Sequence, residues 1–184
     1  MWWLYDGFAE ALDVGPDDDV LDVGCGSARF FDEHAGHVRH VAGLDASEIQ
    51  VAMAREHLAE RIVAGTAEIV LGDAADLPWE DGRFSVVTSL DAIKFVPDPP
   101  AALAEMHRVV RPGGRAVITM GDDSQARLGS APSGTQSAWG IWCWSDADAQ
   151  RLVEEAGFTD VTVSVLPVPS KSQLVRATKS EAEA

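Results

Sequence analysis

Two glycines and a carboxylate stand close together near the start of the chain, in the run DVGCGSAR over residues 22–29. Gly24 and Gly26 allow the backbone to turn tightly and to approach a ligand closely. A dinucleotide-binding loop would carry a third glycine at position 29, but Arg29 stands there. Asp22 would repel a phosphate, whereas it can pair with an ammonium group. The loop therefore favours a ligand with an ammonium group over a pyrophosphate cofactor such as NAD or FAD.

Two further carboxylates follow at the ends of the next two predicted strands. Asp45 closes the strand expected over 41–45, where a carboxylate can accept hydrogen bonds from both hydroxyls of a ribose. Asp73 follows the strand expected over 68–71, and it can accept from an adenine amino group while the Ala74 N–H donates to the ring. The ends of parallel strands form the ligand-binding edge of an open α/β sheet. An ammonium, a ribose and an adenine without a phosphate together predict S-adenosylmethionine as the ligand.

The elements that would position these residues alternate between strand and helix. Strands are expected over 20–23, 41–45, 68–71, 84–90, 115–120, 161–166 and 173–177, and helices over 28–38, 47–61, 99–111 and 145–157. This alternation predicts an α/β fold, with a Rossmann-like, mostly parallel sheet and helices on both faces. Residues 167–170 are too few for a parallel crossover, so the last two strands are expected as an antiparallel hairpin at one edge.

Sequence signals mark where some of these elements begin and end. Ser47 with Gln50, and Ser145 with Asp148, have the spacing of N-cap pairs. The tail from Lys179 onward is short and polar, and it is expected to be frayed.

Composition limits the partners of the chain. Its 184 residues suit one domain over 1–184, and 14 Lys+Arg against 30 Asp+Glu give a net charge of −16. Such a charge repels nucleic acid and anionic membrane surfaces, which leaves a small neutral or cationic molecule as the expected partner. Neither a signal peptide nor a long apolar run is seen, so a cytoplasmic location is predicted. The oligomeric state stays open, with a homodimer as one alternative.

Four segments carry a resemblance to a known family: VLDVGCGSA at 20–28, GLDAS at 43–47, GDAADLP at 72–78 and RVVRPGGR at 108–115. In these segments the chain resembles class I S-adenosylmethionine-dependent methyltransferases, and among them the ubiquinone/menaquinone-biosynthesis-like group of small-molecule enzymes. The likeness covers about residues 5–178. It implies a seven-stranded sheet with an antiparallel last strand, and direct in-line transfer of the sulfonium methyl to a small-molecule acceptor.

The resemblance also implies what the site residues do. Asp22, Gly24 and Gly26 would surround the methionine part of the cofactor. Asp45 would bind the ribose, and Ser89 would lie beneath the sulfonium. With their neighbours, the expected cofactor-binding residues are Tyr5, Asp22, Gly24, Cys25, Gly26, Asp45, Ala46, Asp73, Ala74, Ser89 and Leu90.

The chain departs from the family pattern at four points. Ala28 stands where a third glycine is usual, Ser85 where an aspartate is usual, and Lys94 where a histidine is common. Only 19 residues precede Val20, whereas relatives often carry extra helices there. Another segment would then have to close the pocket.

Lys94 is the candidate for chemistry on the acceptor. It follows the fourth predicted strand, where a substrate would meet the methyl group. Lys94 can anchor an anionic substrate, act as a base if burial lowers its pKa, or simply be a surface lysine. The nearby Asp91 is expected to be a loop acid that faces solvent.

A long connection with tryptophans is the candidate for covering the acceptor. Residues 122–144 are rich in Ser and Gly, and they carry Trp139, Trp142 and Trp144. Connections of this length without a function are uncommon. We predict a substrate lid in which Trp139 and Trp142 contact the acceptor, and the alternative is that these tryptophans fill the core.

Other interpretations stay open on the sequence. His34, His37 and His40 recur at a spacing of three residues, but a solvated helix face is favoured over a metal site, so no metal is expected. The main alternative function is a protein that binds S-adenosylmethionine without methyl transfer, as a partner subunit or for other chemistry. A nicotinamide oxidoreductase is disfavoured by Arg29.

Overall fold

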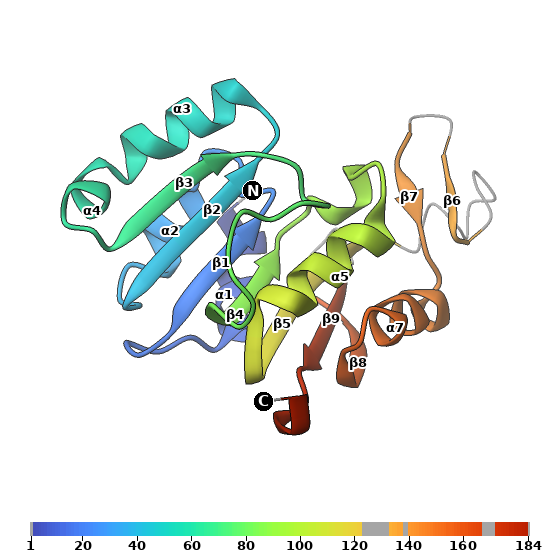
Figure 1. Ribbon diagram of the computed structural model, residues 1–184. Helices are drawn as coiled ribbons and strands as arrows, with labels where there is room; N and C mark the ends of the chain where they lie inside the picture. Colours follow the sequence, from blue (N-terminus) through green and yellow to red (C-terminus); the bar gives the residue numbers. More distant parts are fainter. Residues whose placement is uncertain (1, 123–132, 138–139, 167–171, 184) are drawn as a thin grey trace.

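The computed structural model describes residues 2–122, 133–137, 140–166 and 172–183, with the backbone alone at 2–6, 122 and 183 (Figure 1). A seven-stranded sheet has the order β3-β2-β1-β4-β5-β9-β8. Its strands are β1 (Asp19–Val23), β2 (His40–Asp45), β3 (Ala67–Leu71), β4 (Phe84–Ser89), β5 (Val110–Asp122), β8 (Thr159–Val165) and β9 (Ser172–Thr178). Strand β9 runs antiparallel to both β5 and β8, and the other pairings are parallel. The predicted mostly parallel sheet with an antiparallel hairpin at one edge is confirmed.

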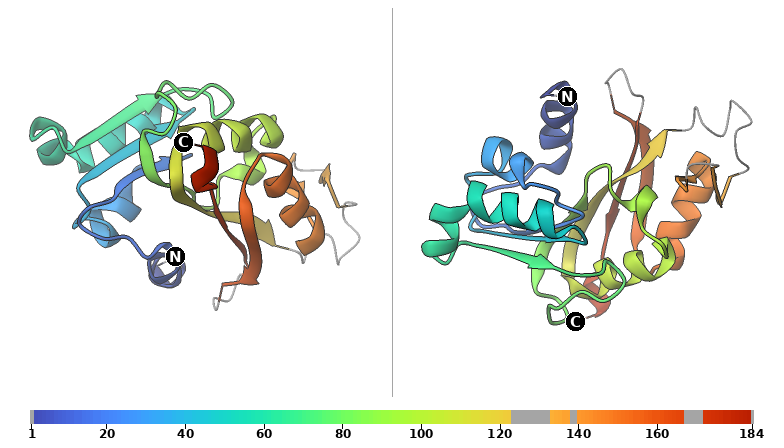
Figure 2. Two further views of the ribbon diagram at one scale, coloured as in Figure 1. Left: turned by 60° about the horizontal axis from the view of Figure 1, so that its bottom comes forward. Right: turned by 90° about the horizontal axis from the view of Figure 1, so that it is seen from above.

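Helices cover both faces of this sheet. They are α1 (Trp2–Leu12), α2 (Arg29–His34), α3 (Glu48–His57), α4 (Ala59–Val63), α5 (Pro99–Val109) and α7 (Asp146–Glu155), with short 3-10 helices η1 (Ile93–Phe95) and η2 (Glu181–Glu183). Neighbouring residues of β4 point into opposite cores, because Val86 packs with Phe31 of α2 and Val87 packs with Leu103 of α5. Figure 2 shows α1 and α7 on opposite sides of β5 and β9. None of the helices in the described parts of the chain is long and apolar enough to cross a membrane.

A separate small sheet stands beside α7. It pairs β6 (Thr135–Gln136) with β7 (Trp142–Cys143) in antiparallel fashion, within the segment predicted as a lid. The sequence did not predict these two strands, because each spans two residues and carries no alternating pattern.

Ser47 and Ser145 are N-caps as predicted, but the capping box expected at Ser47 is only half formed, because the Ser47 N–H donates to Asp45 Oδ1 and not to the Gln50 side chain. Ser47 Oγ accepts a hydrogen bond from the Gln50 N–H at 3.4 Å, and Ser145 Oγ accepts from the Asp148 N–H at 3.2 Å. The helix predicted to run to residue 61 is divided into α3 and α4 at Leu58.

The helix predicted over 28–38 is shorter than expected, because α2 ends at His34. His37 therefore lies outside the helix, and its Nε2 contacts the Val14 carbonyl at 2.9 Å. The His34 ring stacks on Phe30 at 5.6 Å, and His40 begins β2. The shared helix face that would have carried two of these histidines does not exist.

An N-terminal helix that the sequence analysis left unassigned packs against the sheet. Phe8 and Leu12 of α1 are fully buried, and the Phe8 ring meets Phe30 edge-on at 5.3 Å. At the end of α1, the Arg115 guanidinium donates to the Leu12 carbonyl at 3.3 Å, and Arg176 donates to the carbonyl of the residue before it at 3.1 Å. This helix therefore covers one face of the sheet beside α2.

The tail is not frayed where the structure describes it. The Lys179 N–H donates to the Gly114 carbonyl at 3.0 Å, and the Lys179 carbonyl accepts from the Gly113 N–H at 3.0 Å. Its ammonium donates to the His107 carbonyl at 3.0 Å, and the residue is buried. The prediction was wrong because a charged tail residue was taken as solvated, whereas it caps the end of α5.

Candidate cofactor and acceptor site

A cavity of about 560 Å³ opens at the carboxyl-terminal edge of the sheet. Loops that follow β1, β2, β3 and β4 form its wall, as expected for an open α/β sheet. Most of the expected cofactor residues line it, namely Asp22, Gly24, Cys25, Gly26, Asp45, Ala46, Asp73, Ala74 and Leu90. The volume lies within the range of small-molecule and cofactor sites.

The glycine loop after β1 needs its glycines for conformation and for space. Gly24 has a φ of 80°, and a Cβ on it would lie 2.2 Å from the Cβ of Ala92. Gly26 has a φ of 54°. Ala28, where the family usually has a third glycine, keeps a left-handed φ of 56° as the first residue before α2. A left-handed conformation at this position costs about 1–2 kcal/mol for an alanine.

Asp45 ties the loops after β1 and β2 together. Its Oδ2 accepts a hydrogen bond from the Gly26 N–H at 2.9 Å, and its Oδ1 accepts from the Ser47 N–H at 2.9 Å. Each carboxylate oxygen has a further lone pair, so the side chain can still accept hydrogen bonds from a ligand in the cavity.

Asp22 is a buried carboxylate in the cavity wall. It is 3 % exposed, and its Oδ1 has no hydrogen-bond partner among the described residues. Burial raises the pKa of Asp22 to about 7, a backbone hydrogen bond from Leu90 opposes that rise, and the charge of Asp45 adds to it. An unpaired buried oxygen of this kind is costly unless a donor binds to it.

Asp73 and Ala74 lie in the loop after β3. Asp73 Oδ1 accepts from the Ala75 N–H at 3.0 Å, while the Gly72 N–H donates to the Asp45 carbonyl at 3.1 Å. Ala74 is buried at 8 % exposure and is one of the residues that line the cavity.

Ser89, another expected cofactor residue, does not line the cavity wall among the described residues. Ser89 is fully buried at the end of β4, and its Oγ has no partner among the described residues. Tyr5 lies on α1, but its side chain is outside the described part of the chain.

Cys25 does line the cavity wall. Burial raises the pKa of the Cys25 thiol, so this side chain is a neutral group in the wall.

Lys94 is not a free surface lysine. Its ammonium pairs with Asp91 Oδ1, and its side chain is 19 % exposed. Its Cδ lies 3.6 Å from the position that a Cβ on Gly121 would occupy, so the side chain runs along the end of β5. Lys94 therefore lies next to the cavity on its β5 side, without being part of the described wall.

Asp91 has a second role besides facing solvent. It is 44 % exposed at its side chain, yet it lines the cavity. Its φ of 59° lies in the left-handed region, which is uncommon for residues other than glycine, and its N–H donates to Thr119 Oγ1 at 2.6 Å. Strained backbone of this kind is concentrated at functional sites.

The predicted lid tryptophans have different surroundings. Trp139 lies outside the described residues, as does much of the segment 122–144. The Trp142 Nε1–H donates to the Val96 carbonyl at 3.0 Å, and its ring is parallel to that of Trp144 at 6.1 Å. Trp144 is 4 % exposed and belongs to the core, as the alternative interpretation has it. Trp142 lines a second cavity of about 270 Å³ instead of the main one.

Sequence reasoning missed part of the wall. Other residues that line the cavity are Ser27, Arg29, Phe30, Leu44, Gln50, Gly72, Asp91, Ala92, Phe95, Val96 and Pro97. Phe95 is 57 % exposed, which is unusual for a large apolar side chain and places it at an open part of the wall. The sequence signal was weak, because residues 91–97 contain only the single-turn 3-10 helix η1, which is too short to show a periodic pattern.

Ser85, the remaining departure from the family pattern, lies away from the cavity. Its hydroxyl donates to Asp18 Oδ1 at 2.7 Å and accepts from the Asp19 N–H at 3.0 Å, at the amino-terminal edge of the sheet. Ser85 therefore links the start of β4 to the start of β1 and does not contribute to the cavity.

Sequence comparison identifies relatives of the chain. A family model described as methyltransferase domain matches residues 21–118. A demethylmenaquinone methyltransferase from Bacillus mycoides is 38 % identical over 109 residues, which cover 58 % of this chain and 46 % of the relative. An uncharacterised 37.1 kDa protein in transposon Tn4556 of Streptomyces fradiae is 39 % identical over 112 residues, which cover 59 % and 32 %. The chain thus spans less than half the length of these curated relatives.

Solved structures share the fold. The cyclase SpnF aligns with a TM-score of 0.79 at 18 % identity, over 96 % of this chain and 80 % of that chain. A phosphoethanolamine N-methyltransferase from Haemonchus contortus, solved with phosphomonomethylethanolamine and S-adenosylhomocysteine, aligns with a TM-score of 0.77 at 16 % identity, over 97 % and 53 %. One fold therefore hosts different reactions, and these likenesses concern the fold alone.

The matched residues 21–118 include the loops after β1, β2 and β3 and the whole of β4. The sequence match to the family model therefore covers most of the cavity wall. Membership of this family supports S-adenosylmethionine as the cofactor of the protein. The chain belongs to the methyltransferase domain family, as a class I S-adenosylmethionine-dependent methyltransferase.

Proposed function

We propose that the protein transfers the methyl group of S-adenosylmethionine to a small-molecule acceptor by direct in-line displacement. The observation that carries this proposal is the unpaired Oδ1 of buried Asp22 in the cavity wall. A carboxylate there suits an ammonium group and excludes a phosphate. The net charge of −16 also argues against nucleic acid as the acceptor.

In this proposal each part of the cofactor has its own residues. Asp22 accepts from the methionine ammonium, and the backbone at Gly24 and Gly26 lies against the methionine part. Asp45 accepts from the ribose hydroxyls. Asp73 and the Ala74 N–H bind the adenine, Ser89 and Leu90 lie beneath the sulfonium, and Tyr5, Cys25 and Ala46 complete the cofactor set.

The chain's part in the reaction is alignment and exclusion of water. The bound cofactor supplies an electrophilic methyl group; its bond to sulfur breaks as the bond to the acceptor forms, and the acceptor then loses a proton. The residues around the sulfonium must hold the acceptor in line and keep water away. No group of the chain has to act as an acid or base in such a displacement.

Lys94 is proposed as the anchor of the acceptor. Its ammonium lies beside the cavity on the β5 side, where it is paired with Asp91. An acceptor with an anionic group would share this ammonium. Demethylmenaquinone, which the name of the Bacillus relative gives as its substrate, is one small molecule that merits testing.

The segment 122–144 is proposed as the substrate lid, with Trp139 and Trp142 as acceptor contacts. Support comes from the hydrogen bond of Trp142 to the carbonyl of Val96, which itself lines the cofactor cavity. Trp142 thus joins this segment to the cavity wall.

The proposal is tested with a methyl-labelled donor and fractionated small metabolites, with demethylmenaquinone as one defined acceptor. Label is expected in a small-molecule product with wild-type protein and at least tenfold less with Asp45→Ala, because ribose binding is lost (about 1.5–3 kcal/mol for each charge-assisted bond). Binding of S-adenosylhomocysteine without transfer to any fraction would favour a binding protein that does not transfer methyl groups.

A further inference from the structure

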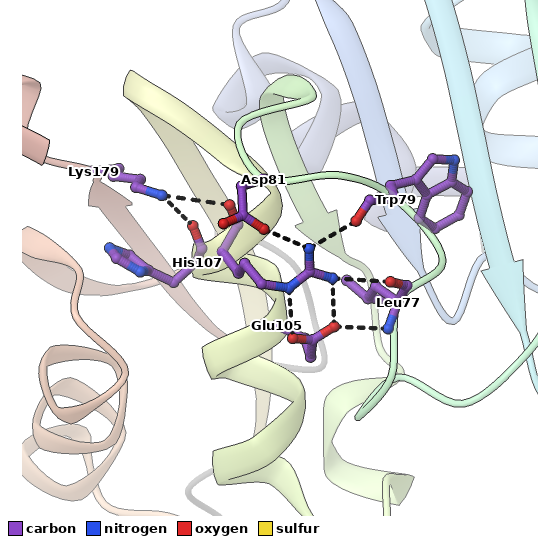
Figure 3. A network of polar contacts seen from close by, with 7 residues as sticks. Leu77, Trp79, Asp81, Glu105, His107 and Lys179 are labelled. Atoms are coloured by element: carbon purple, nitrogen blue, oxygen red, sulfur yellow. Dashed lines mark hydrogen bonds and ion pairs between the residues drawn. The ribbon is translucent and has the colours of Figure 1, made fainter. Parts of the chain in front are cut away.

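Arg108, at the end of α5, holds the loop that follows β3 through a network of polar contacts (Figure 3). Its Nη1 donates to the Trp79 carbonyl at 2.7 Å and to Asp81 Oδ1 at 2.8 Å. Its Nη2 donates to the Leu77 carbonyl at 2.9 Å. Nε and Nη2 each donate to one oxygen of Glu105 at 2.7 Å. Every N–H of the guanidinium therefore has an acceptor, which fixes its orientation.

Glu105 binds the same loop, and we refer to Arg108 and Glu105 as the α5 pair. Glu105 Oε2 also accepts from the Leu77 N–H at 2.8 Å, so both backbone polar groups of Leu77 are held by the pair. The hydrogen bond from Arg108 lowers the pKa of Glu105, which keeps the carboxylate ionised. Lys179 donates to the carbonyls of His107 and Arg108, which secures the helix end that carries the guanidinium.

The loop held by the α5 pair is the one that carries the proposed adenine contacts. Ala74 lies three residues before Leu77, and both side chains are buried in the same core. At the other end of this stretch, the Gly72 N–H donates to the Asp45 carbonyl at 3.1 Å. The backbone that lines the cavity is thus fixed at one end by β2 and at the other by the α5 pair.

The far half of the loop has supports of its own. Trp79 Nε1–H donates to Glu68 Oε1 at 2.9 Å, and the Trp79 ring packs edge-on against Phe84 at 5.4 Å. These contacts hold the loop on the sheet without the α5 pair. The hydrogen bonds from the α5 pair to Leu77 therefore fix the position of the loop backbone next to the cavity. A displacement of about 1 Å there is enough to impair ligand recognition.

We infer that the α5 pair positions the Asp73–Ala74 backbone for recognition of the adenine base. The inference rests on the proposed function, which assigns adenine to these two residues. Arg108 and Glu105 do not line the cavity, so they act through the loop as positioning residues. Their removal should therefore lower selectivity for the base more than affinity for the rest of the cofactor.

The test compares S-adenosylhomocysteine with S-inosylhomocysteine, in which a carbonyl replaces the adenine amino group. Wild-type protein should bind the adenine compound at least about tenfold more tightly, because the replacing carbonyl would face a carboxylate. Arg108→Met should bring the ratio of the two Kd values to within about threefold of one. Arg108→Lys keeps the charge without the planar fork, and it should give an intermediate ratio.

Arg83→Met is the matched control. It removes a guanidinium that pairs with Asp19 at 3.1 Å and stacks on Phe84 at 5.1 Å, next to the amino-terminal end of β4. The Kd ratio should stay at its wild-type value even where the free energy of unfolding falls. Glu105→Gln provides a second variant if Arg108→Met does not fold, and it should also lower the ratio.

Two different failures can be told apart. An unchanged Kd ratio in folded Arg108→Met or Glu105→Gln protein would overturn the inference and leave the adenine assignment standing. Equal affinities for the two compounds in wild-type protein would overturn the adenine assignment itself, and the inference with it.

Discussion

The Gly26 N–H donates a hydrogen bond to Asp45 Oδ2 at 2.9 Å, and this bond joins the glycine loop after β1 to the end of β2. The other oxygen of Asp45 accepts from the Ser47 N–H, at the start of α3. One carboxylate thus organises two walls of the cavity before any ligand is bound. Its effect on binding includes this organisation as well as the proposed contacts to the ribose.

Substitution of Asp45 should therefore affect both binding and stability. Asp45→Ala should weaken S-adenosylhomocysteine binding by a factor of tens or more and lower the free energy of unfolding by about 1–3 kcal/mol, because two amides lose their acceptor. Asp45→Asn retains one acceptor oxygen and should lie between Ala and wild type in both respects. Calorimetry and denaturant unfolding check this, and wild-type affinity in Asp45→Ala would remove Asp45 from the site.

The raised pKa of Asp22 predicts how stability depends on pH. The carboxyl ionises near its ordinary value of 3.8 in the unfolded chain and at about 7 in the folded protein. Between these values the folded state binds the extra proton, so the free energy of unfolding should fall as pH rises from about 4 to about 7. The fall should be at most about 4 kcal/mol, and it should be absent in Asp22→Asn. Denaturant unfolding of both proteins without ligand gives the comparison.

Cofactor binding should show the opposite dependence on pH. The methionine ammonium pairs with the ionised form of Asp22, so binding releases a proton when the free protein is protonated. The Kd for S-adenosylhomocysteine should rise about tenfold for each pH unit below 7 and level off above it. Asp22→Asn should bind weakly, with no such slope. A wild-type Kd that does not change between pH 5.5 and pH 8 would contradict the assignment of Asp22 to the ammonium.

Lys94 should act on the acceptor and not on the cofactor. Lys94→Met should raise KM for an anionic acceptor by about tenfold, because a charge-assisted contact is lost, while the Kd of S-adenosylhomocysteine stays unchanged. Lys94→Arg should retain most of the activity. The stability cost should be small, because the Asp91 side chain is 44 % exposed and water screens the ion pair. An unchanged KM in Lys94→Met would exclude Lys94 as the anchor.

Trp142 and Trp144 should respond differently to truncation, although their rings are stacked. Trp144→Ala should lower the free energy of unfolding by about 3–5 kcal/mol, because its side chain fills the core. Trp142→Ala should mainly raise the acceptor KM, with cofactor affinity nearly unchanged. Trp142→Phe tests the bond to the Val96 carbonyl separately. If Trp142→Ala costs as much stability as Trp144→Ala and leaves KM unchanged, the lid assignment fails.

The sequence predicted best what depends on local pattern. The strand-end acids Asp22, Asp45 and Asp73 converge on one cavity, because parallel strands end at one edge of the sheet. The caps at Ser47 and Ser145 also follow from short-range spacing. These signals involve residues a few positions apart, or residues at equivalent ends of neighbouring strands.

Features that depend on distant parts of the chain were missed or wrong. Lys179 looked like a solvated tail residue, but the end of α5 provides carbonyl acceptors for its ammonium. Asp91 is a partly exposed loop acid, as expected, but it also lines the cavity, and its N–H donates to Thr119 of the distant strand β5. The α1 helix carries Phe8, Ala11 and Leu12 at helical spacing, a pattern that was readable but not used.

The contact of Arg176 with the end of α1 has a consequence for the order in which the chain folds during synthesis. Arg176 lies in β9, and the carbonyl that it binds belongs to Ala11, 165 positions earlier. Phe8 and Leu12 pack in the same core as Leu174, so α1 cannot complete its packing until the ribosome has released β9. An early apolar helix must therefore wait for a late strand before its buried face is covered.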